Sequence, residues 1–115
     1  MAYSAPNSIL KIPVGNSPGY SMITLDASVA GHDGLLLSTN GRDLTVVNNA
    51  GGGEGRVMTF SSNNKWESAT LQRTFMTGPV FPTTATTNGK RVFVLYAYLH
   101  LRGVGHSDYT IQAVP

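Results

Sequence analysis

The sequence has no cysteine among its 115 residues, and only 12% of the residues are charged. Without cysteine the chain can form no disulfide, thiol nucleophile or cysteine-ligated zinc site. The absence also leaves undetermined whether the chain works in an oxidising or a reducing compartment. The eight Lys and Arg residues are scattered along the chain and give a net charge of only +2. Because no basic run could follow a phosphate backbone, we expect no nucleic-acid partner.

Long apolar runs are also missing. No stretch approaches the roughly 18 consecutive apolar residues that a membrane-spanning helix needs, and residues 1–8 lack the basic start and apolar core of a signal peptide. We therefore expect a soluble chain with no membrane partner, whose localisation the sequence leaves unknown. No segment carries an apolar stripe at helical spacing, and prolines such as Pro13, Pro18, Pro79 and Pro82 interrupt the candidates. Helix should be nearly absent.

The residues that are abundant indicate β structure. The sequence contains 13 Gly and 6 Pro together with many Ser, Thr and Asn, a composition typical of short strands separated by frequent turns. A hydrophobic content of 41% over 115 residues supports one domain with a real core. We therefore predict a single all-β domain.

An internal repeat organises this domain. Residues 38–47 (STNGRDLTVV) align without a gap with residues 86–95 (TTNGKRVFVL), an offset of 48 residues (86 − 38). Each copy has the pattern strand, Asn-Gly turn, strand. Asn-Gly favours a hairpin because both residues accept the positive φ of a type I′ turn. A period of about 40–50 residues is typical of four-stranded propeller blades.

Further segments extend the repeat. Residues 55–60 have counterparts in residues 7–12 and 108–113, which we predict as third strands, and residues 20–25 and 66–75 are predicted outer strands. The resulting units are a partial blade (2–27), a full blade (31–77) and a second partial blade (80–115). A β-sandwich with similar turn spacing is the alternative, but a sandwich does not require the gapless 48-residue match.

Three segments resemble a known family, namely residues 34–38 (GLLLS), 44–48 (LTVVN) and 55–57 (GRV). They resemble a blade of the SMP-30/gluconolactonase-like six-bladed β-propellers, which are related to the NHL group. The resemblance implies an incomplete arc of about three blades, equivalent to roughly the C-terminal half of such a propeller. It would be either a fragment that reassembles or an engineered piece. An open arc exposes apolar faces and strand edges, so we expect self-assembly into a homo-oligomer, a homodimer first and a trimer as the alternative.

The resemblance also implies where a site would lie. In these propellers the loops at one face surround a central channel, and here those loops contain residues 32–33, 48–49, 81–84 and 96–100. The channel-mouth candidates are His32, Asp33, Asn48, Asn49, Thr83 and Tyr96. The resembling hydrolases hold a divalent cation with oxygen ligands at this mouth, which makes Asp33 and Asn48 candidate ligands for an ion such as Ca²⁺, and His32 a candidate acid or base.

Three functional hypotheses follow. The first is a self-assembling propeller module without catalysis and without a cofactor. The second is a metal-dependent lactonase active after assembly, against which Phe81 or Thr83 stands where the family has an aspartate. The third is a carbohydrate-binding propeller. Other candidates have simpler explanations, because His100 and His106 lack metal-ligand spacing and the glycine-rich residues 51–55 lack the Lys-Ser/Thr ending of a phosphate-binding loop.

Overall fold

The computed structural model describes residues 2–3, 8–15, 19–50, 53–105 and 108–115. In these ranges the fold is mostly β, with no α-helix and one 3₁₀ helix, η1 (Leu99–Val104). The prediction of β structure with almost no helix is confirmed. Within the same ranges, no helix is long and apolar enough to cross a membrane.

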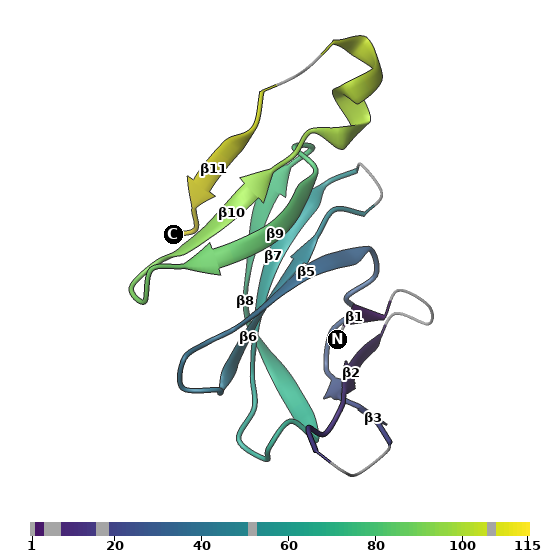
Figure 1. The fold of residues 1–115 in the computed structure, drawn as a ribbon, viewed down its shortest axis with the longest axis vertical. Coiled ribbons are helices and arrows are strands. Elements are labelled where there is room, and N and C mark those ends of the chain that lie inside the picture. The colour runs from purple at the N-terminus through teal and green to yellow at the C-terminus, as the bar shows by residue number, and fades with distance from the viewer. Residues whose placement is uncertain (1, 4–7, 16–18, 51–52, 106–107) are drawn as a thin grey trace.

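The strands form three sheets (Figure 1). The N-terminal sheet has the order β1 (Ala2–Tyr3), β2 (Ser8–Lys11), β3 (Ser21–Met22). The central sheet has the order β4 (Thr24–Leu25), β8 (Ser68–Gly78), β7 (Gly55–Ser61), β6 (Asp43–Asn48), β5 (His32–Leu37). The C-terminal sheet has the order β11 (Thr110–Ala113), β10 (Val92–Tyr96), β9 (Pro82–Thr87).

Both predicted hairpins form, β5–β6 and β9–β10. Their turns differ from the predicted type I′, because only the glycine of each Asn-Gly pair has positive φ, +72° at Gly41 and +90° at Gly89. The asparagine side chains instead accept hydrogen bonds from the next N–H groups of the loop. Asn40 Oδ1 accepts from Arg42 at 2.9 Å, and Asn88 Oδ1 accepts from the two residues that follow Gly89. This capping stabilises loops longer than a two-residue turn.

The segment predicted as one outer strand, residues 20–25, is divided between two sheets. Its first part is β3, but β4 leaves the N-terminal sheet and pairs in parallel with β8. Two hydrogen bonds hold it there, from Thr24 N to Glu67 O at 3.1 Å and from Leu71 N to Asp26 Oδ1 at 2.7 Å. The chain thereby ties the N-terminal sheet to the outer edge of the central sheet.

The central sheet is covered on both faces. On one face Leu44, Val46, Met58 and Phe60 form a core with Ile9 of the N-terminal sheet. On the other face Val47 and Val57 form a second core with Val94 and Tyr96 of the C-terminal sheet. Since side chains alternate across a strand, the adjacent buried residues of β6 belong to opposite cores.

Strand register and packing identify equivalent positions in the three sheets. Val57 lies opposite Val47 and Ile111 lies opposite Leu95, and Val47 and Leu95 are matched residues of the repeat. Ile9 is matched with Val57 in the sequence and, like Val57, packs against the sheet that follows its own. The sequence alignment, which matched Val57 with Thr110, is therefore one residue out of register in the third unit. The long connection through η1, rather than the sequence spacing, sets where β11 pairs. Ile9, Val57 and Ile111 are structural equivalents.

Candidate functional site

The ends of four strands meet at the place where the channel-mouth residues were predicted. Asn49, just after β6, donates from Nδ2 to Asp33 Oδ2 at 3.0 Å and to Pro82 O at 3.3 Å. Pro82 in turn lies opposite Tyr96 in the β9–β10 pair. The Asn49 amide is buried while Asp33 is exposed, so the structure places this carboxylate at the surface with a buried donor beneath it.

His32 and Asn48 lie on the opposite face of the same strands. The Asn48 amide donates to Ala30 O and accepts at Oδ1 from Ala50 N at 3.2 Å. His32 is buried, and its Nε2 lies 3.1 Å from Ser8 O in the N-terminal sheet. Asp33 is instead bound by Asn49, which faces Pro82 of the C-terminal sheet, so the two proposed calcium ligands, Asp33 and Asn48, point to different sides of the sheet.

Thr83 and Tyr96 have mainly packing roles at this end of the strands. The Thr83 carbonyl oxygen lies close to Gly34, because a Cβ atom added to Gly34 would be only 2.5 Å from this oxygen. Tyr96 is buried in the core between the central and C-terminal sheets. Burial, reinforced by the neighbouring Tyr98, raises the pKa of the Tyr96 phenol above its ordinary value. Beside them, the rings of Phe81 and His100 stack with centroids 6.0 Å apart.

The arrangement offers little for metal chemistry. Among the residues that the structure describes, no three His, Asp or Glu side chains come close enough to hold an ion together. The oxygen of the Asn48 amide is already used by a backbone N–H. Asp33 is left as a single carboxylate, and a hard divalent cation prefers six or more oxygen ligands.

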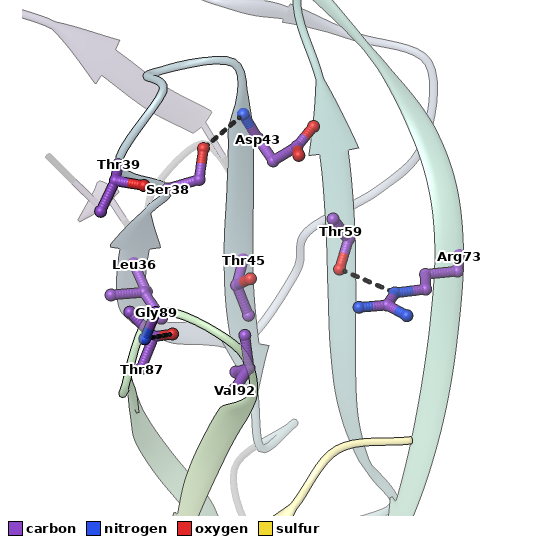
Figure 2. Close-up of a pocket in the computed structure, with 10 residues that line it drawn as sticks. All are labelled: Leu36, Ser38, Thr39, Asp43, Thr45, Thr59, Arg73, Thr87, Gly89 and Val92. Atoms are coloured by element: carbon purple, nitrogen blue, oxygen red, sulfur yellow. Dashed lines mark hydrogen bonds between the residues drawn. The ribbon is translucent and has the colours of Figure 1, made fainter.

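A separate cavity of about 150 Å³ lies between the central sheet and the β9–β10 turn (Figure 2). Five of the residues around it carry hydroxyl groups: Ser38, Thr39, Thr45, Thr59 and Thr87. Asp43 and Arg73 also line it, with Leu36, Gly89 and Val92 completing the wall. Sequence reasoning did not select these residues, although the alternation of polar and apolar residues along 43–46 places Asp43 and Thr45 on one face of β6.

The charged groups of this cavity have protein partners. Arg73 donates from Nε to Thr59 Oγ1 at 3.5 Å and from Nη1 to Pro115 O at 3.3 Å. The Asp43 carboxylate accepts a hydrogen bond from the Ser61 hydroxyl.

Searches of protein-family models, curated proteins and solved structures find no match to this chain. The geometry of the chain is therefore the only guide to its function, and its most distinctive feature is a pair of uncovered apolar faces.

The first uncovered face belongs to the C-terminal sheet. It contains Phe93, Leu95 and Ile111, which we call the C-terminal face. Ile111 occupies the position equivalent to Ile9 and Val57. Those two side chains are 1% and 2% exposed, each covered by the next sheet, whereas Ile111 is 69% exposed.

The second uncovered face belongs to the N-terminal sheet. Leu10 lies opposite Met22 and, one residue from Ile9, points away from the central sheet. Leu10 and Met22 form what we call the N-terminal face. Met22 is 49% exposed. The described part of the chain thus has an apolar face open at each end of its series of sheets.

Proposed function

We propose that this chain is a self-assembling β-propeller module, in which three sheets form an arc that another copy of the chain completes into a closed ring. The observation that carries the proposal is the series Ile9, Val57 and Ile111. Two members are buried by a following sheet, and the third is exposed where the series stops. A sheet of the same kind on the C-terminal face would bury the third member as well.

Physical chemistry favours this completion. An exposed apolar side chain beside further apolar residues is typical of an interaction surface, and on this face the exposed Ile111 lies beside the half-buried Phe93 and Leu95. The edge strand β11 also has backbone groups available for pairing. Association buries the apolar surface, at about 25 cal/mol for each Å² removed from water. Closed rings are also the usual outcome when identical chains associate.

The proposed assembly is a homodimer. Each copy supplies three sheets, so two copies supply the six that the resembling propellers contain, and a trimer is the alternative number. The proposed role is assembly rather than catalysis. It needs neither a metal nor a cofactor, and it agrees with Asn48 being engaged by its own backbone neighbours. The lactonase and carbohydrate-binding hypotheses have no comparable support, since Tyr96 is buried rather than offered to a sugar.

A charge placed on the C-terminal face tests the proposal. Ile111→Asp should leave the fold intact, because Ile111 is exposed within one copy, and should prevent association because a carboxylate would be buried between copies. Gln112→Asp is the matched control, since Gln112 is the exposed neighbour on the other face of β11. Light scattering on a sizing column should give the monomer mass for Ile111→Asp and the assembled mass for the control. Equal masses for both variants would contradict the proposal.

A further inference from the structure

We call the side of a sheet that faces the next sheet along the chain its following side, and the side that faces the sheet before it its preceding side. The two internal sheet contacts of this chain follow one rule. In the first, Ile9 on the following side of the N-terminal sheet packs in one core with Met58 and Phe60 on the preceding side of the central sheet. In the second, Val57 on the following side of the central sheet packs with Val94 on the preceding side of the C-terminal sheet. Each contact joins a following side to a preceding side.

The two open faces are one of each kind. The C-terminal face is a following side, because Ile111 is equivalent to Val57 and Ile9. The N-terminal face is a preceding side. Leu10 immediately follows Ile9 just as Met58 immediately follows Val57, and Met58 is buried by the sheet before it. The molecule therefore presents the two different halves of its own internal interface.

We infer that the C-terminal face of one copy docks on the N-terminal face of the next, in a head-to-tail contact that repeats the internal sheet contacts. This inference rests on the proposed self-assembly and specifies its geometry. The occupant of each face is a second copy of this chain, because the surface needed to cover one face is the surface that the other end of the same chain leaves open. In a closed ring of two copies the two-fold axis relates two such contacts, each made from two different faces. The alternative is a contact in which the C-terminal faces of two copies pair with each other.

Complementation between two defective variants tests the geometry. Ile111→Asp spoils the C-terminal face and keeps the N-terminal face, while Met22→Asp does the reverse. Each variant alone loses every head-to-tail contact, and we expect its dissociation constant to rise at least about 100-fold, which is about 2.7 kcal/mol. Mixed one to one, they retain one intact contact, between the N-terminal face of Ile111→Asp and the C-terminal face of Met22→Asp. The mixture should form a 1:1 complex, weaker than the wild-type assembly.

Native mass spectrometry with one variant isotope-labelled identifies that mixed complex. The control pair is Gln112→Asp and Ser21→Asp, which place the same charge on exposed neighbours of the two test positions, and each control should assemble alone. Ile111→Ser and Met22→Ser provide milder changes at the same positions, and circular dichroism checks that every variant is folded.

The possible outcomes separate the two claims. Two monomeric variants that form a 1:1 complex when mixed support the head-to-tail contact. If Met22→Asp still assembles alone while Ile111→Asp does not, or if both are monomeric and the mixture gives no complex, the head-to-tail inference is overturned while self-assembly stands. A wild-type chain that is monomeric at every concentration would overturn the proposed function itself.

Discussion

Gly34 in β5 and Thr83 in β9 lie in such close backbone contact that a Cβ atom on Gly34 would come within 2.5 Å of the Thr83 carbonyl oxygen. The same atom would lie 2.7 Å from the Cα of Thr84. The contact joins an edge strand of the central sheet to an edge strand of the C-terminal sheet. Glycine at this position thus sets how closely two successive sheets of the series can approach, independently of the apolar core beside them.

Gly34→Ala should therefore destabilise the chain. Backbone atoms cannot move aside as a flexible side chain can, so β9 must shift, and overpacking of this kind costs about 1–3 kcal/mol in the free energy of unfolding. Gly103→Ala is the control, because a Cβ atom at Gly103 meets no atom within 4 Å. Urea denaturation measures both variants. If Gly34→Ala changed the free energy of unfolding as little as Gly103→Ala does, the close approach of β5 and β9 at Gly34 would not limit the packing of the two sheets.

The Asn49 amide connects the start of β5 to the start of β9 through Asp33 and Pro82. Asn49→Ala removes a buried donor from both acceptors, and the loss should lower the free energy of unfolding by about 1–3 kcal/mol. Asn63→Ala is a matched change at an exposed asparagine and should stay within about 0.5 kcal/mol of wild type. Denaturant titration compares the two. If Asn49→Ala costs no more than the control, the amide is not the link between these strands.

The sequence predicted the strands better than the contacts between them. The 48-residue match and the Asn-Gly pairs located both hairpins, because strand alternation and turn preference are local properties. The register of β11 was predicted one residue out of place, because the connection through η1 contains no local signal for where pairing resumes. The crossing of β4 to β8 was missed for a similar reason, since it depends on hydrogen bonds such as that between Asp26 and Leu71, which are far apart in the sequence.

The candidate site shows the same division. The sequence selected Asp33 and Asn49, which the structure brings together. The sequence did not reveal that Asn48, one residue away, points to the other face. There its amide hydrogen-bonds to the backbone of Ala30 and Ala50. The open faces also escaped prediction residue by residue. Whether Ile9 is buried and Ile111 exposed depends on which sheet has a neighbour, not on local sequence.

Calcium should leave the thermal stability of the chain unchanged, because Asp33 is a single carboxylate and Asn48 faces away from it. Melting temperatures of wild type, Asp33→Ala and the exposed control Asp108→Ala should each be the same with about 5 mM calcium and with a chelator, a concentration that would saturate even weak sites. A calcium-induced rise that only Asp33→Ala abolishes would instead reveal a metal site and revive the hydrolase hypothesis.

Alkaline pH should destabilise the fold through Tyr96. Its pKa is raised in the folded chain by burial and by the neighbouring Tyr98, so the unfolded chain loses the phenolic proton first. The stability that this group contributes is fully present below its unfolded pKa of about 10 and falls as the pH rises through that value. Tyr96→Phe cannot ionise, so its melting temperature should fall less than that of the wild type between about pH 9 and pH 11. An identical fall in both proteins would exclude Tyr96 as the cause.

The mass of the wild-type chain in solution is the most direct test of self-assembly. Light scattering on a sizing column, repeated across a tenfold dilution, measures that mass without any probe or variant. A homodimer would have twice the 12.2 kDa of one chain, with Ile111 and Met22 buried between the two copies, and this is the mass that we expect. A particle of 12.2 kDa at every concentration would contradict it, because the two apolar faces would then be stable in water without a partner.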